Sequence, residues 1–146
     1  NSAAGGITRL LDMGVEDYLL GSTVNGILAQ RLVRRLDPET AVSYEPSPEV
    51  IAQFELEKYA GGKPIRLWKP GSSAANPSGY RGRQAIMEFL VMSDPLRRLV
   101  MQRADAGEVE KQARAEGMRT MYEDGIAKSL AGVTTLEEVL RVTQEG

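Results

Sequence analysis

The chain has 146 residues, a net charge of −2 and no Cys or His, and this length suits one domain or two small subdomains. The slightly acidic balance gives no bulk attraction to nucleic acid or to an anionic membrane, and the composition excludes disulfides, Cys/His zinc sites and catalysis by a histidine or a thiol. No apolar run approaches the roughly 18 residues that span a bilayer, and the N-terminal residues show no signal-peptide pattern.

Two short helices are expected at the start of the chain. Asn1 or Ser2 can cap the first helix, apolar residues follow at helical spacing, and Gly14 marks its expected end. The sequence VEDYLLGS predicts a second short helix that ends near Gly21.

Residues 24–36 fit two different structures. Their apolar residues form one helical stripe, with Arg31, Arg34 and Arg35 on the opposite, solvated side. A long buried strand produces a similar pattern, so the periodicity favours a helix and leaves a strand open.

Residues 37–79 concentrate proline and glycine, which indicates a loop-rich insert. Ser47 as cap and Pro48 at the first position predict one helix, continuing through EVIAQFELEKY. PIRLWKP predicts a short strand. The expected small core of this insert consists of Phe54, Leu56, Leu67 and Trp68.

Residues 83–92 predict a strand that closes the insert, and the chain is expected to be helical from there to its end. Capping residues, and Pro95 in a first turn, indicate where these helices start. Glycines indicate where two of them end. Thr135 and Glu138 have the spacing of a capping box. The remaining expected caps are Ser93 or Asp94 and Thr120, and the expected ends are Gly117 and Gly132.

Five arginines are the candidate contact residues. Arg31, Arg34 and Arg35 are compatible with a phosphate or nucleic-acid patch, although a solvated face beside an apolar stripe explains them more simply. In GYRGR, glycines indicate a sharp turn, and Arg81 and Arg83 project the same way if the segment is extended. Pairing with carboxylates elsewhere in the chain is favoured over ligand binding for these two.

No catalytic or cofactor-binding residue is expected. The carboxylate pairs Glu123–Asp124 and Glu137–Glu138 lie in first turns of expected helices, where negative charge is favourable anyway. The sequence contains neither a phosphate-binding G-x-x-x-x-G-K-[ST] loop nor a nucleophile elbow. The residues alone therefore indicate a structural or regulatory piece.

Three blocks of sequence, in order, carry a resemblance that covers nearly the whole chain. They are NSAAGGITRLLDMGVEDYLLGSTVNGILAQRLVRRL, GYRGRQAIMEFLVMSDPLRRLV and MYEDGIAKSLAGVTTLEEVLRVT. Together they resemble the C-terminal part of the traffic ATPases of type II secretion and type IV pilus assembly, and the ending AGVTTLEEVLRVT is more similar to the secretion branch.

The resemblance implies an α/β fold, mainly helical in this part, with three regions. Residues 1–36 would be the last part of a RecA-like P-loop NTPase core, with 24–36 as a late strand. Residues 37–79 would be a degenerate metal-binding subdomain, and residues 80–146 a strand followed by a C-terminal helical subdomain.

The resemblance also places the family's catalytic parts upstream of this region. Its Walker A loop, Walker B carboxylates and aspartate box precede Asn1, which matches the last residue of a His-Thr-Asn box. The intact protein would bind ATP and Mg, form a hexamer and work at the cytoplasmic side of the inner membrane with platform proteins, without inserting into the membrane. The chain alone is expected to be inactive, and its five candidate arginines to serve junction or subunit contacts.

One departure from the family concerns metal. The family's subdomain holds one metal, expected to be zinc, on two C-x-x-C pairs, and zinc in structural sites prefers thiolate or imidazole ligands. We therefore expect no zinc and an insert held by its own packing, with Tyr44 among the packing residues. The four cysteine positions are occupied by Asp37, Thr40, Ser72 and Ala75.

Two other functions remain open from the sequence. The first is a stand-alone, non-catalytic interaction module that kept the family's tail and lost its motor. The second is a nucleic-acid binder, which requires the five arginines on one exposed face and an affinity that falls steeply with salt. The acidic net charge argues against the second.

Overall fold

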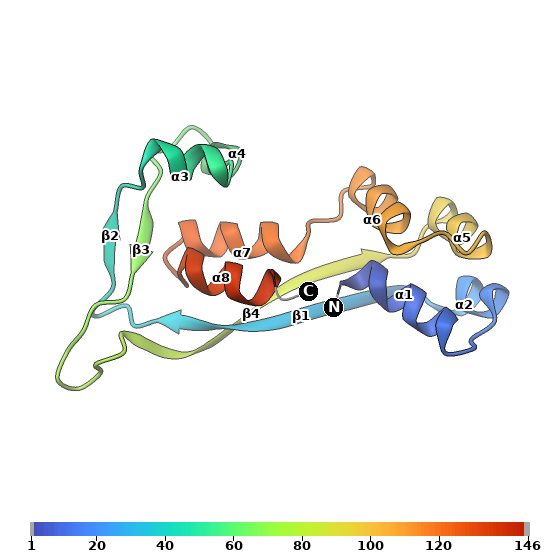
Figure 1. Ribbon diagram of the computed structural model, residues 1–146, viewed down its shortest axis with the longest axis horizontal. Coiled ribbons are helices and arrows are strands. Elements are labelled where there is room, and N and C mark those ends of the chain that lie inside the picture. The colour runs from blue at the N-terminus through green and yellow to red at the C-terminus, as the bar shows by residue number, and fades with distance from the viewer. Residues whose placement is uncertain (1, 145–146) are drawn as a thin grey trace. The chain divides into compact units, whose positions relative to one another are not determined.

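The computed structural model describes residues 2–144, so the predicted role of Asn1 lies outside the described residues. The chain has the expected mixed α/β content and is mostly helical (Figure 1). The elements are α1 (Ala3–Asp12), α2 (Asp17–Thr23), β1 (Gly26–Leu36), β2 (Val42–Tyr44), α3 (Pro48–Gln53), α4 (Glu57–Ala60), β3 (Leu67–Lys69), β4 (Tyr80–Val91), α5 (Asp94–Met101), α6 (Ala106–Ala115), α7 (Met121–Leu130) and α8 (Leu136–Thr143).

Most helices begin where local side-chain chemistry predicts. Ser2, Ser47, Ser93 and Thr135 each accept a hydrogen bond from the backbone N–H three residues later. These bonds satisfy one of the donors that every helix start leaves free. Asp105 caps α6 in the same way, which the sequence analysis did not single out.

The segment 24–36 contains a strand, so the helical alternative suggested by its periodicity is wrong and the strand implied by the resemblance is confirmed. Burial explains why. Leu28 and Leu32 would belong to the core stripe of a helix, yet their residues are 54% and 47% exposed, while Val33 is fully buried. The strand pairs with β4 in a two-stranded sheet, and Asp37 donates its N–H to the carbonyl of Gly79 beyond the end of both strands.

The insert contains a small ribbon and two short helices in place of the one helix predicted. Strands β2 and β3 pair antiparallel, with Ser43 opposite Trp68. The helix that begins at Pro48 ends at Gln53, because Glu55 adopts a left-handed φ of 51° that a continuous helix does not allow. The strand after the insert also begins earlier than predicted, at Tyr80 instead of Arg83.

The first of two compact units comprises residues 2–30 and 87–121. Helix α2 packs on α5, α1 packs on α6, and α5 packs on α6. Their apolar faces enclose one core together with the end of β4, centred on Ile7, Leu20, Leu90, Leu96, Val100 and Val109. None of the helices in residues 2–144 has the length and apolar character needed to cross a membrane.

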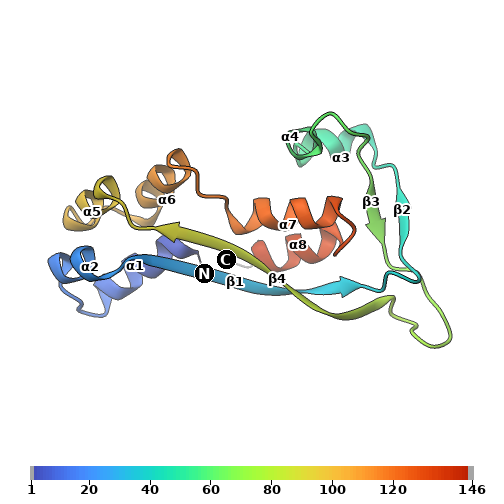
Figure 2. The ribbon, with the colours of Figure 1, turned by 180° about the vertical axis from the view of Figure 1, so that it is seen from behind.

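The second compact unit comprises residues 31–86 and 122–144. Helices α7 and α8 lie side by side in both views (Figures 1 and 2), and Gly125 permits this because any Cβ there would collide with Val139. Leu56 and Leu67 are buried in the core as predicted, and Phe54 and Tyr44 pack against it partly buried. The prediction was wrong for Trp68, which is half-buried and lies outside this cluster. The three-part division into 1–36, 37–79 and 80–146 stays a prediction.

Candidate functional site

The carboxylate of Glu138 lies at the centre of a hydrogen-bond network in the second unit. It lies in the first turn of α8, its side chain is 3% exposed, and Thr135 caps the same turn by accepting from the N–H of Glu138 at 3.2 Å. One oxygen, Oε1, accepts from Nε and Nη2 of Arg34 at 3.0 and 2.9 Å. The other, Oε2, accepts from the backbone N–H of Arg34 at 2.8 Å.

Arg141, one turn further along α8, binds the same carboxylate from the other side. Its Nη2 donates to Oε2 of Glu138 at 2.8 Å and its Nε donates to Oε1 at 3.3 Å. Burial raises the pKa of Glu138, but the hydrogen bonds from Arg141 and Arg34 outweigh burial and lower that pKa from 4.5 to about 2. The carboxylate therefore stays ionised across the physiological range.

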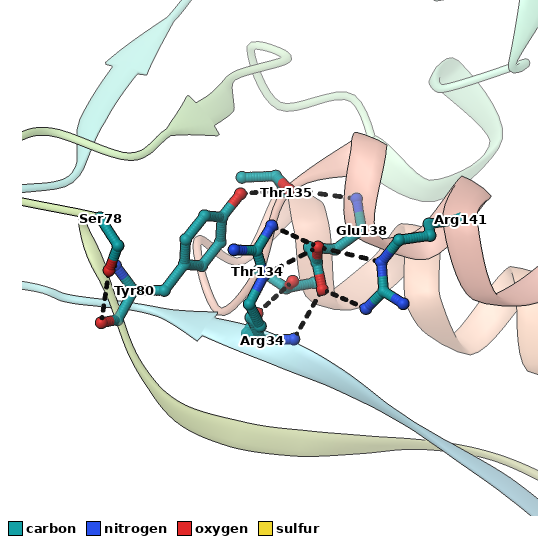
Figure 3. A network of polar contacts seen from close by, with 7 residues as sticks. All are labelled: Arg34, Ser78, Tyr80, Thr134, Thr135, Glu138 and Arg141. Atoms are coloured by element: carbon teal, nitrogen blue, oxygen red, sulfur yellow. Dashed lines mark hydrogen bonds and ion pairs between the residues drawn. The ribbon is translucent and has the colours of Figure 1, made fainter.

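Tyr80, the tyrosine of the GYRGR segment, completes this network. The guanidinium of Arg34 lies 4.1 Å from the centre of the Tyr80 ring, within the range of a cation–π contact. The Tyr80 hydroxyl and Oγ1 of Thr135 are 3.1 Å apart and share a hydrogen bond. The hydroxyl of Thr134 donates to the carbonyl of Arg34 at 2.7 Å. Figure 3 shows how these side chains converge between β1, β4 and α8.

The geometry of this network suits a structural role, in which one element is held against another, better than catalysis. The two oxygens of the Glu138 carboxylate accept five hydrogen bonds from Arg34 and Arg141, which leaves this group poorly suited to accept a proton from a substrate. A buried carboxylate that receives charged and backbone donors is instead a strong, directional joint. It ties strand β1 to helix α8, 104 positions apart in the chain.

A second buried carboxylate, Glu88, plays a similar part in the first unit. It lies on β4, and its two oxygens accept from the backbone N–H groups of Ala3 at 2.8 Å and Met121 at 3.0 Å. These are the first residues of α1 and α7, where a negative charge is favourable. The sequence analysis missed Glu88, although a carboxylate inside the apolar run AIMEFLV was a usable signal.

The third buried carboxylate, Asp37, lies at the base of the insert, where the chain leaves β1 and returns into β4. Its oxygens accept from the side-chain amide of Asn76 at 3.0 Å and from the N–H of Glu39 at 3.0 Å, and Arg81 lies 3.4 Å away. The hydrogen bond from Asn76, with smaller contributions from Glu39 and Arg81, lowers the pKa of Asp37. Asn76 also donates to the carbonyl of Tyr80 at 2.9 Å, and so connects the two chain segments at the base of the insert.

The four residues at the positions where the resemblance places cysteines do not fit a zinc ion. Asp37 is engaged as described, the buried hydroxyl of Thr40 lacks a hydrogen-bond partner within residues 2–144, and Ser72 and Ala75 are exposed. Alanine has no donor atom, and one carboxylate with two hydroxyls is not a tetrahedral zinc set. In the described part of the chain, no group of three or more Asp or Glu side chains converges on a common point.

The five candidate arginines differ in their surroundings. Arg34 binds Glu138, and Arg81 lies within ion-pair distance of Asp37 and, at 3.9 Å, of Glu39. No ion pair within residues 2–144 involves the other three, Arg31, Arg35 and Arg83, and Arg31 is half-buried. Two of the five arginines, Arg34 and Arg81, are therefore already engaged with carboxylates.

Comparison with known proteins gives a consistent result. The sequence matches the family described as type II/IV secretion system protein over residues 1–141. It is 63% identical over 145 residues to the type II secretion system protein E of Xanthomonas campestris pv. campestris, covering 99% of this chain and 26% of that protein.

Two further relatives represent the pilus assembly branch and the secretion branch of the family. The type IV pilus assembly ATPase PilB of Thermus thermophilus is 42% identical over 146 residues, with 99% of this chain and 16% of the relative covered. The type II secretion system ATPase E of Vibrio cholerae is 41% identical over 146 residues, with 99% and 28% covered. The chain thus spans between 16% and 28% of the length of these relatives.

Proposed function

The chain belongs to the type II/IV secretion system protein family, and from that membership we propose that it is the C-terminal region of an ATPase that powers type II protein secretion. The 63% identity to a type II secretion system protein E supports the secretion branch. In the intact protein, ATP and Mg would be bound by residues outside this chain, because it contains no phosphate-binding loop.

Within that protein, the role of this region is to hold the architecture and transmit force. The observation that carries this proposal is the Glu138 carboxylate, which is buried and saturated by Arg34 and Arg141. Glu88 and Asp37 are committed in the same way to backbone and side-chain donors. Within residues 2–144, the three buried acids each accept hydrogen bonds that connect separate parts of the chain. Such connections favour rigidity, which force transmission requires.

An exposed apolar row supports a role in packing against other parts of the assembly. Phe89 and Val91 alternate along β4 and are 55% and 60% exposed, and Leu28 of β1 is exposed to a similar degree. Strand residues spaced by two share one face of a sheet, so this face is suited to be covered by the rest of a longer protein or by a neighbouring subunit. We propose that such contacts belong to a cytoplasmic hexamer that acts on platform proteins of the inner membrane.

A chimera tests this proposal directly. Residues 1–141 of this chain replace the matching segment of the Xanthomonas campestris protein in a strain that lacks its own copy, and secretion of type II substrates is measured. We expect secretion close to that of the native protein. A matched chimera carrying the Thermus pilus segment is expected to secrete less.

The proposal is overturned if the first chimera accumulates normally yet secretes no more than the deletion strain. It is also overturned if the pilus segment restores secretion and this chain does not. Protein levels measured in the same cultures separate either result from a failure to fold.

A further inference from the structure

A hollow of about 360 Å³ opens on the second unit between α4, β3 and the end of α7. This volume is in the range of sites that take a ligand or a few side chains of a partner. The residues of its lining that matter are Tyr59, Lys63, Arg66, Trp68, Leu130 and Ala131. We call it the cationic groove.

Trp68 is fixed at the wall of the cationic groove. On strand β3, Leu67 points into the core, so its neighbour Trp68 lies on the opposite face of the strand. The indole rests on the backbone of Gly132, where a Cβ would lie only 3.0 Å from the ring. A half-buried ring held in this way offers a preformed apolar surface.

The charges around this ring are unbalanced. Lys63 and Arg66 are exposed, and neither forms an ion pair within residues 2–144. Arg66 donates from Nη2 to the neutral hydroxyl of Ser43 at 3.0 Å, which orients its guanidinium without neutralising it. No acidic residue lines the groove. Two uncompensated cations therefore stand beside two aromatic rings in a chain whose net charge is −2.

We propose that the cationic groove docks an acidic segment of a partner protein, with carboxylates on Lys63 and Arg66 and an apolar side chain on Trp68. Tryptophan, tyrosine and arginine are the residues that most often dominate protein–protein binding. The aromatic rings are recessed in a hollow, which suits a protruding side chain and not a flat lipid surface. The inference rests on the proposed function only in taking the partner to be a protein of the secretion assembly.

Trp68 is the only tryptophan of the chain, so its fluorescence reports on the groove directly. The purified chain is titrated with the peptide Asp-Phe-Asp-Leu-Asp and, as a control, with Asn-Phe-Asn-Leu-Asn. We expect a saturable change in emission with the acidic peptide that is at least tenfold weaker with the neutral one. The double variant Lys63→Glu, Arg66→Glu should weaken acidic-peptide binding at least tenfold. Lys69→Glu, a charge reversal on the same strand outside the lining, should leave it unchanged.

The proposal fails if the acidic peptide produces no change at millimolar concentration, or if both peptides bind equally. It also fails if the double variant, shown folded by circular dichroism, binds as tightly as the native chain. Vesicles of phosphatidylglycerol that shift the emission while the peptide does not would assign the groove to a lipid surface. None of these results affects the chimera test, which measures secretion.

Discussion

Substituting Glu138 by Gln should destabilise the second unit by an amount that the structure lets one work out. A fall in pKa from 4.5 to about 2 corresponds to about 3.4 kcal/mol of differential interaction with the charged form. The partner side chains of Arg34 and Arg141 are 53% and 50% exposed, and solvent screening reduces this figure. We therefore expect a loss of about 2 kcal/mol at pH 7, or roughly 4–8 °C in Tm for a chain of this size.

The assay is urea unfolding followed by circular dichroism, with Glu137→Gln as the matched control. Glu137 is the preceding residue of the same first turn and is exposed, so its substitution should cost less than about 0.5 kcal/mol. Equal losses in the two variants would refute the reasoning, because the burial and bonding of Glu138 would then contribute nothing.

The pH dependence of stability follows from the same carboxylate. Because the folded pKa lies below the unfolded value, the stabilisation is fully present above about pH 4.5 and is lost as the pH falls towards 2. The Glu138→Gln variant should show a flatter curve in this window. A parallel course of the two curves between pH 4.5 and 2 would contradict this account.

Three other changes have expected outcomes. Glu88→Ala should cost about 2 kcal/mol in urea unfolding, since it leaves two buried N–H groups at helix starts without an acceptor, and a loss below 0.5 kcal/mol would contradict this. Gly79→Ala should destabilise the chain far more than Gly82→Ala. Both glycines have a positive φ, but only at residue 79 would a Cβ collide with Gly71 and Pro70. Equal falls in Tm for the two variants would show that this close backbone approach is unimportant. Dialysis against EDTA should leave Tm unchanged, because the side chains at the positions where the resemblance places cysteines do not form a zinc set, and stoichiometric zinc by elemental analysis would overturn this.

Local chemistry predicted much of the fold. A cap such as Ser93 depends on the N–H groups of the next few residues, so the sequence around it contains all the information needed. The same holds for Gly117, whose left-handed backbone follows the end of α6. These features could be located to within a residue or two.

Long-range contacts could not be predicted in this way. Glu138 has the spacing of a capping-box acid, but its carboxylate turns to Arg34, 104 residues away, and not to the N-terminal end of its own helix. The spacing of apolar residues in 24–36 fits a helix as well as a strand. Leu28 and Leu32 complete the helical stripe in the sequence, but in the structure they lie on the exposed side of a strand. Only the pairing with β4 decides between the two structures.

Nucleotide turnover by the chain itself tests the central claim most directly. The purified 146-residue chain is assayed for Mg-ATP hydrolysis, and for Mg-ATP binding by calorimetry, with the intact type II secretion system ATPase E of Vibrio cholerae as the positive control. The account predicts turnover by the intact protein and neither binding nor hydrolysis by the chain. Hydrolysis that purifies with the chain and disappears in its Glu138→Gln or Glu88→Gln variant would contradict the claim that these carboxylates are structural joints.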